Sequence, residues 1–156
     1  MESFVQAVMQ MKIFFSTAWQ TIFEIGRMSQ PAAKKILLVM ASGSLGAVSR
    51  YGVGVLAAKA WGANFPWGTL IVNLAGCFLI GLLFSLADHV RLLTPEVRLL
   101  LITGYLGALT TFSTFSLETM NAIRAGMAVQ PLINILLNTV GGLTLTFLGM
   151  WLGSIK

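Results

Sequence analysis

Four long apolar stretches constrain this chain more than any other feature of its sequence. They cover residues 36–58, 67–87, 97–121 and 131–153. Each reaches the roughly 20 residues that a helix needs to cross the hydrocarbon core of a bilayer. Charged residues make up only 10% of the chain, against about a quarter in soluble domains, and the mean hydropathy is +0.85. The sequence therefore predicts an all-α membrane protein with four transmembrane helices.

Residues 1–34 differ from the rest of the chain. Charged residues such as Lys12 and Glu24 interrupt every apolar run there, and the apolar residues recur at helical spacing. This pattern is typical of an amphipathic helix that lies in the membrane interface rather than crossing the bilayer. We therefore predict an N-terminal interfacial extension over residues 1–34 and a four-helix transmembrane domain over residues 35–156.

The third apolar stretch has an unusual centre. After Gly104 and Gly107, residues 110–116 read Thr-Thr-Phe-Ser-Thr-Phe-Ser. Glycine, serine and threonine weaken a helix, by entropy or by competing for its backbone hydrogen bonds. We expect the third helix to be broken at mid-membrane. Non-helical backbone at that depth is tolerated only where it is buried in protein or lines a watery cavity, so the break indicates the functional region.

The charged residues argue against two classes of function. The chain carries a net charge of +5, but its ten Lys and Arg residues are scattered along the sequence and do not form the basic face of a nucleic-acid-binding protein. His89, predicted to lie alone in a loop, and Cys77, inside an apolar run, are the single residues of their types. With dispersed acidic residues, no catalytic triad or paired carboxylates can be assembled from the pattern. Neither nucleic-acid binding nor enzyme catalysis is expected.

Polar side chains recur inside the predicted spans. Asn73 lies early in the second span, the hydroxyl cluster lies in the third, and Asn134, Asn138 and Thr146 fall near one stripe of the fourth. Taken singly, each is better explained by hydrogen bonding between helices. Together they form a donor-rich track through apolar surroundings. Such a track suits a small anion, whose hydration shell must be replaced by N–H and O–H donors.

Phe112 and Phe115 lie three residues apart beside the predicted break, so they share a face if the local turn is helical. Lipid contact or core packing is the usual role of phenylalanine. An aromatic ring also has a positive edge, and ring edges aimed into a narrow path attract an anion without holding it too tightly. The pair is therefore a candidate selectivity element.

Two charged residues lie near or within the spans. Arg50 either extends its side chain to the interface or raises the anion concentration at a vestibule. Glu118 follows the hydroxyl cluster and either forms a hydrogen bond at a pore mouth or anchors the helix at the interface. We treat Arg50, Glu118 and Asn138 as candidate vestibule residues.

Three segments carry a resemblance to a known family. They are residues 43–51 (Gly-Ser-Leu-Gly-Ala-Val-Ser-Arg-Tyr), residues 68–76 (Gly-Thr-Leu-Ile-Val-Asn-Leu-Ala-Gly) and residues 104–116, which end in the Thr-Thr-Phe-Ser-Thr-Phe-Ser run. The chain resembles the small bacterial fluoride channels, also known as camphor resistance proteins, over residues 35–155. The resemblance implies an antiparallel, dual-topology homodimer in the bacterial plasma (inner) membrane, with two pores along the dimer interface.

The resemblance also implies roles for particular residues. The channel would carry fluoride passively out of the cell, after hydrogen fluoride has entered and dissociated in the cytoplasm. Where the broken third helices cross at the dimer centre, backbone carbonyls of Gly107 and Thr110 would hold a structural Na⁺, a hard cation that prefers oxygen ligands. The remaining roles would be a pore-lining amide from Asn73, ring edges from Phe112 and Phe115, and a hydroxyl track from Ser113, Thr114 and Thr146.

The charge distribution leaves the direction of insertion open. Dual insertion needs nearly balanced charge, because Lys and Arg are retained on the cytoplasmic side. A fixed orientation with an oppositely inserted partner is the alternative. Five basic residues fall on one side of the four-span map, Lys34, Lys35, Arg91, Arg98 and Lys156, against Lys59 and Arg124 on the other.

Two rival functions remain. A small multidrug transporter also has four spans and forms dimers, but it exchanges protons through a membrane-embedded carboxylate. Glu118 is the one carboxylate placed within a predicted span. The other rival is a membrane scaffold without transport activity, in which the polar groups only hold helices together.

Overall fold

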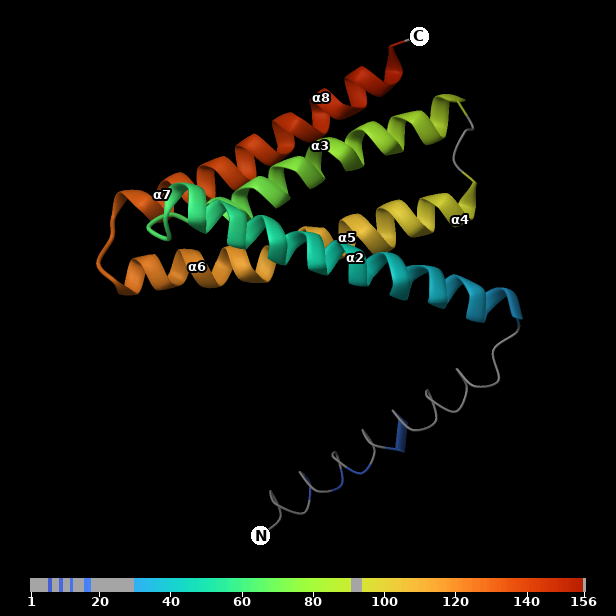
Figure 1. The fold of residues 1–156 in the computed structure, drawn as a ribbon, viewed down its shortest axis with the longest axis horizontal. Coiled ribbons are helices and arrows are strands. Elements are labelled where there is room, and N and C mark those ends of the chain that lie inside the picture. The colour runs from blue at the N-terminus through green and yellow to red at the C-terminus, as the bar shows by residue number, and fades with distance from the viewer. Residues whose placement is uncertain are drawn as a thin grey trace. The chain divides into compact units, whose positions relative to one another are not determined.

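The computed structural model describes residues 30–90 and 94–155, together with positions 6, 9, 12, 16 and 17. The chain divides into two compact units, Met1–Leu37 and Leu38–Lys156. Most of the predicted interfacial helix lies outside the described residues, as do Arg91 and Lys156 of the charge count, so the division at residue 34 stays a prediction. The second unit holds nearly all of the four long apolar stretches (Figure 1).

Among the described residues, four helical segments are long and apolar enough to cross a membrane, and no strand occurs. The prediction of an all-helical chain with four such segments is confirmed. Each observed segment extends beyond its predicted stretch or matches it, because polar residues at a span end continue the helix into the interface. The segments are Ala32–Trp61, Trp67–Ala87, Pro95–Arg124 and Val129–Ser154.

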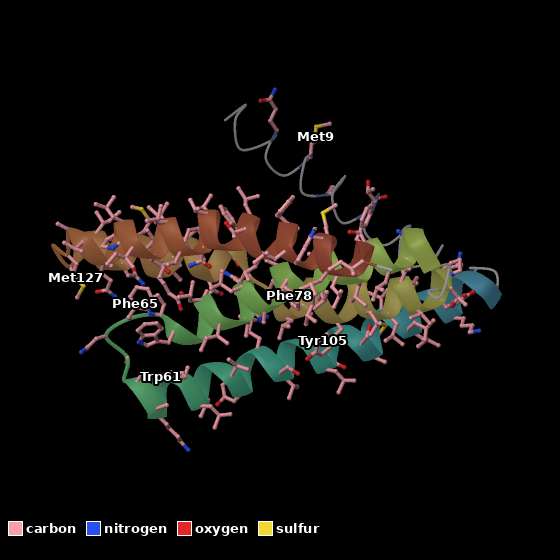
Figure 2. The ribbon with its side chains drawn as sticks, turned by 90° about the horizontal axis from the view of Figure 1, so that it is seen from above. Met9, Trp61, Phe65, Phe78, Tyr105 and Met127 are labelled. Atoms are coloured by element: carbon pink, nitrogen blue, oxygen red, sulfur yellow. The ribbon has the colours of Figure 1, made fainter. Side chains whose placement is uncertain are left out.

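The first helix, α2 (Gln30–Trp61), ends at a glycine. Gly62 has a φ of +79°, and its N–H donates to the carbonyl of Ala58 at 3.0 Å. Glycine adopts this left-handed conformation without the strain that other residues incur, so it terminates the helix. Gln130 then donates to the carbonyl of Asn64, which joins this loop to the start of the fourth segment. Trp61, Phe65 and Met127 accordingly lie at one end of the structure (Figure 2).

The second helix, α3, runs from Trp67 to Val90 and corrects one prediction. His89 was expected in a loop, but its backbone lies in the last turn of α3; its side chain is outside the described residues. The charged residues at 88 and 89 do not end the helix, because only proline, glycine or the residue before a proline strongly opposes helical backbone.

The third segment contains two residues of extended backbone. Thr94 caps its start by accepting from Val97 N at 3.4 Å. At its middle, Thr110 has φ −82° and ψ 155°, and Thr111 has φ −152° and ψ 114°. Helical backbone resumes at Phe112, so Ser113, Thr114 and Ser116 are helical. The elements are α4 (Pro95–Arg98), the π-helical η1 (Leu99–Leu106), α5 (Gly107–Leu109) and α6 (Phe112–Arg124).

The fourth segment follows a turn in which Gly126 has a φ of +75°. It is continuous from α7 (Val129–Leu136) through the π-helical η2 (Leu137–Gly141) to α8 (Gly142–Ser154). A π-helical turn widens the helix by one residue and is often found at functional sites. Both π-helical elements contribute residues to the cavity described below.

Close packing of α3 against α8 depends on glycines from both helices. The two helices lie side by side (Figure 1). A Cβ atom on Gly149 would overlap the carbonyl oxygen of Phe78, and a Cβ atom on Gly81 would overlap that of Thr146. Small residues of this kind let helix backbones approach closely in a membrane, where van der Waals packing drives association.

Gly149→Ala is expected to destabilise the protein by about 1–3 kcal/mol, because the helices must separate to relieve the overlap. The measurement is the thermal unfolding midpoint of purified protein in detergent. Gly52→Ala is the matched control, since a Cβ atom there meets nothing within 4 Å. Equal midpoints for the two variants would contradict this account of the packing.

Few large side chains are buried within the described chain. Val72, Leu106 and Leu109 form one buried cluster, and Leu70 and Phe115 are also buried. In contrast, Tyr51 is 75% exposed and Leu143 is 70% exposed. Apolar surface on this scale is unfavourable in water, and it indicates that lipid or another protein chain covers the helices.

Candidate functional site

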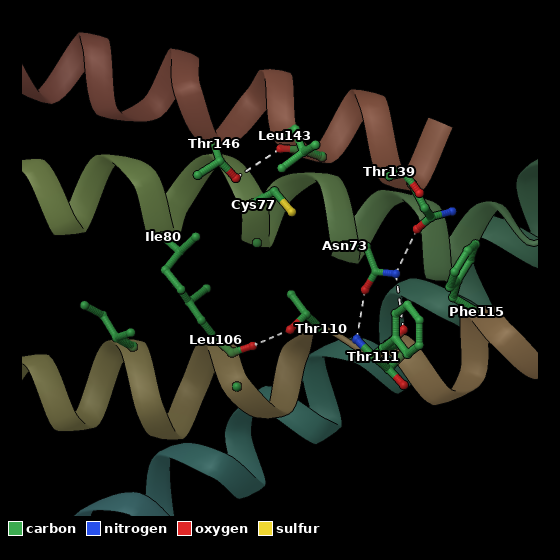
Figure 3. Close-up of a pocket in the computed structure, with 16 residues that line it drawn as sticks. Asn73, Cys77, Ile80, Leu106, Thr110, Thr111, Phe115, Thr139, Leu143 and Thr146 are labelled. Atoms are coloured by element: carbon green, nitrogen blue, oxygen red, sulfur yellow. Dashed lines mark hydrogen bonds between the residues drawn. The ribbon is translucent and has the colours of Figure 1, made fainter. Parts of the chain in front are cut away.

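One cavity of about 470 Å³ lies between the second, third and fourth helical segments (Figure 3). Its wall is mostly apolar and includes Cys77, Ile80 and Leu106. Ser113, Thr114, Arg50 and Glu118 do not line it. Most of the residues nominated from the sequence do: Asn73, Gly107, Thr110, Phe112, Phe115, Asn138 and Thr146.

Asn73 holds the extended segment in place. Its Oδ1 accepts from Thr111 N at 2.8 Å, and its Nδ2 donates to Thr111 O at 3.2 Å (Figure 3). The side-chain amide thus pairs with both backbone groups of one residue, as a neighbouring strand would. Unpaired backbone groups are costly away from water, so Asn73 supplies the hydrogen-bond partners that the interrupted helix does not.

The extended backbone also leaves two carbonyls without the N–H donors that a continuous helix would give them. In a continuous helix, Gly107 O would accept from Thr111 N, and Thr110 O would accept from Thr114 N. Here Thr111 N donates to Asn73 Oδ1 at 2.8 Å, and Thr114 N donates to Thr111 Oγ1 at 3.2 Å. The carbonyls of Gly107 and Thr110 therefore lack their helical donors. Neutral oxygens in this condition are suitable ligands for a hard cation.

The hydroxyl groups are mostly engaged with their own helices. Thr146 Oγ1 donates to Gly142 O at 3.0 Å, and Thr110 Oγ1 donates to Leu106 O at 3.0 Å. Thr111 Oγ1 caps α6 and contacts the hydroxyls of Ser113 at 3.2 Å and Thr114 at 3.0 Å. A hydroxyl proton can rotate about its C–O bond, so these groups can redirect their donation when a better acceptor arrives.

Asparagines extend the polar contacts away from Asn73. Asn73 Nδ2 donates to Asn138 Oδ1 at 2.9 Å, and Asn138 Nδ2 donates to Asn134 Oδ1 at 2.9 Å. Asn134 is 1% exposed and donates through Nδ2 to Thr119 Oγ1 at 2.9 Å. From the sequence, Asn134 was expected in the donor-rich track and Thr111 in the hydroxyl cluster, but neither had a specific role at the site, and Thr119 was not predicted. The spacing of four residues between Asn134 and Asn138 was a visible signal for their contact.

Phe112 and Phe115 both line the cavity but differ in burial. Their ring centroids are 5.5 Å apart, with the ring planes tilted by 54°. Phe115 is 8% exposed, whereas Phe112 is 79% exposed. The two rings therefore share a face, as their spacing predicts, and the Phe112 ring is largely uncovered in a single chain.

Arg50 and Glu118 each have a buried polar atom with no partner among the described residues: Arg50 Nε and Glu118 Oε2. Glu118 Oε1 accepts from Thr69 Oγ1 at 2.8 Å. The two residues do not line the cavity, so the structure does not bring them together with Asn138, which does. Their assignment to a vestibule stays a prediction.

The site is thus an apolar cavity lined by the amides of Asn73 and Asn138, several rotatable hydroxyls and two phenylalanine rings, and its described lining contains no charged side chain. Such a lining can solvate a small ion without a strong charge that would trap it. Residues 37–150 match the family described as CrcB-like protein, Camphor Resistance (CrcB). The chain belongs to the CrcB family.

Relatives of the CrcB chain cover the same region. A protein of Dehalococcoides mccartyi (strain CBDB1) is 47% identical over 125 residues, covering 78% of this chain and 93% of its own. One from Shewanella amazonensis is 46% identical over 119 residues, covering 75% and 94%. One from Leptospira interrogans serovar Lai is 38% identical over 120 residues, covering 77% and 94%. Each is named a fluoride-specific ion channel, FluC.

Family membership confirms the resemblance stated from the motifs. It also agrees with the four apolar helices in making this CrcB chain a multi-pass membrane protein. The matched region contains every residue that lines the cavity. The comparisons give no support to the alternative of a small multidrug transporter.

Proposed function

We propose that this CrcB-family chain is a fluoride-selective ion channel, and not an enzyme, that lets fluoride leave the cell passively and so lowers cytoplasmic fluoride. The observation that carries the proposal is the 47% identity over 125 residues to a fluoride-specific channel, together with the family match over residues 37–150, which include the whole cavity. The chemistry of the cavity supports it, because the available groups are neutral donors.

Fluoride gives up its water only if other donors replace it. In the cavity, the Asn73 amide, the hydroxyls of Thr110 and Thr146, and the positive edges of Phe112 and Phe115 can do so. Each donor is neutral, so the ion is solvated without being trapped and can leave again. Ser113 and Thr114 lie next to this lining and would continue the hydroxyl track.

We propose that two chains assemble as an antiparallel homodimer. The support is that Phe112 belongs to the cavity wall and yet is 79% exposed, so the wall is incomplete in one chain. A second chain placed against this face would enclose the ring and complete a path. The extended residues Thr110 and Thr111 would then form a break in the third span at mid-membrane, where backbone outside a helix must face protein or water.

A structural Na⁺ at the dimer centre fits the carbonyls of Gly107 and Thr110. Both have lost their helical donors, as described above. Among the described residues, no group of His, Cys, Asp and Glu could hold a metal ion, so main-chain oxygens are the available ligands. When bound, the ion would supply positive charge that holds the two interrupted helices together.

We place the channel in the plasma (inner) membrane of a bacterium, in contact with lipid along the exposed apolar side chains. The direction of insertion depends on the basic residues. Arg98 lies at the opposite end of the third segment from Arg124, and Lys59 lies in the last turn of α2. Both dual insertion and a fixed orientation with an inverted partner chain are compatible with this arrangement.

Purified protein reconstituted into liposomes loaded with potassium fluoride is expected to release fluoride when a potassium ionophore dissipates the voltage. A fluoride electrode measures the release. Chloride-loaded vesicles should release little, and a proton gradient should not be needed. Retention of fluoride as in protein-free vesicles would contradict the channel, and exchange of a cationic drug for protons would favour a transporter.

A further inference from the structure

A chain of side-chain hydrogen bonds begins and ends on the backbone of the third segment. It starts at Thr111 N–H, which donates to Asn73, and passes through Asn138 and Asn134. It then reaches Thr119, whose Oγ1 donates to the carbonyl of Phe115 at 2.7 Å. The chain therefore connects the extended residue beside the cavity with the carbonyl of a cavity-lining phenylalanine.

The two ends of this hydrogen-bond chain determine the orientation of every amide in it. Thr111 N–H can only donate, so Asn73 must present Oδ1 to it and Nδ2 to Asn138. At the other end the Phe115 carbonyl can only accept, so the Thr119 hydroxyl must donate to it and accept from Asn134 Nδ2. Asn138 must therefore direct its oxygen towards Asn73.

This direction leaves Asn73 without an unused N–H. One of its two amide hydrogens is directed to Thr111 O at 3.2 Å and the other to Asn138 Oδ1 at 2.9 Å. An anion can bind this amide only by replacing one of the two acceptors. Both residues line the cavity, but the Thr111 acceptor is a backbone carbonyl of a buried residue, whereas the Asn138 acceptor belongs to a side chain that can turn away.

We propose that the Asn138 carbonyl oxygen is the resident acceptor that fluoride must replace on the Asn73 amide, which makes Asn138 a positioning residue that sets the channel's affinity for its ion. The proposal rests on the proposed function and deepens it. Asn134 contributes by holding Asn138 Nδ2 through both its side-chain oxygen at 2.9 Å and its backbone carbonyl at 3.0 Å. Asn138 therefore turns its oxygen towards Asn73 whenever the cavity is empty.

Asn138→Ala removes the competitor and frees one N–H of Asn73. The concentration of fluoride that gives half-maximal flux is then expected to fall about fivefold, the factor that one neutral hydrogen bond is typically worth. Asn138→Ser is expected to change it in the same direction, because its shorter side chain does not reach Asn73. A purely structural role for Asn138 would not make the ion bind more tightly.

The test measures initial fluoride efflux from proteoliposomes over a series of fluoride concentrations, after size-exclusion chromatography has shown intact assembly. Asn121→Ala is the matched control, an exposed asparagine of α6 outside the cavity lining, and should keep the wild-type half-saturation. An unchanged or raised value in assembled Asn138→Ala or Asn138→Ser overturns the proposal, as does failure of both variants to assemble. Silent wild-type vesicles contradict the channel function itself, and the inference with it.

Discussion

Replacing Phe112 with isoleucine is expected to lower fluoride flux at least about tenfold while the protein stays folded and assembled. Tenfold corresponds to about 1.4 kcal/mol on the barrier to transport. The reason is electrostatic: the ring has a positive edge that attracts an anion, and an aliphatic side chain has none. Because Phe112 is 79% exposed in one chain, the substitution removes little packing within that chain.

Proteoliposome efflux checks this result, with size-exclusion chromatography to verify assembly. Phe147→Ile is the matched control, since Phe147 is 68% exposed and does not line the cavity. Phe115→Ile should lower flux similarly, but Phe115 is 8% exposed, so a loss of stability accompanies the change. Wild-type flux in an assembled Phe112→Ile protein would refute a role for the ring edge.

Much of the fold follows from the sequence, because the bilayer imposes a simple requirement. A span must be long, apolar and helical, and each of the four stretches meets all three conditions. The ends of the helices were less predictable. Helix α3 continues through His89, since charge alone does not stop a helix in the interface. The π-helical turns of η1 and η2 were not predicted, because nothing in the spacing of their residues distinguishes an i→i+5 backbone hydrogen bond from the ordinary i→i+4 bond.

The site was predictable in residue types but not in partners. Hydroxyl groups next to glycine indicated weak helical backbone, and Thr110 and Thr111 are the extended residues of that run. Which donor meets which acceptor depends on the rotation of three separate segments about their axes. The pairing of Asn73 with Thr111 therefore had no counterpart in sequence spacing, and neither did the contact of Asn134 with Thr119.

Asn73→Leu is expected to have the largest effect on stability among the site variants. Leucine is close to asparagine in size but pairs with neither backbone group of Thr111, a buried residue. Each buried group left unpaired costs about 1–3 kcal/mol, so the loss is about 2–6 kcal/mol for the pair. We expect the variant to lose its assembled form in detergent, and its fluoride flux with it. Thermal unfolding followed by size-exclusion chromatography measures the first effect.

Asn73→Asp separates two roles of Asn73, holding the backbone of Thr111 and donating to the ion. A carboxylate still accepts from Thr111 N–H, but it donates to neither Thr111 O nor Asn138. The aspartate variant should therefore be less stable than the wild type, because a carboxylate oxygen replaces the N–H that faces Thr111 O and Asn138 Oδ1, and it should conduct little fluoride because its amide donor is gone. Wild-type flux in a folded aspartate variant would show that the Asn73 N–H does not solvate the ion.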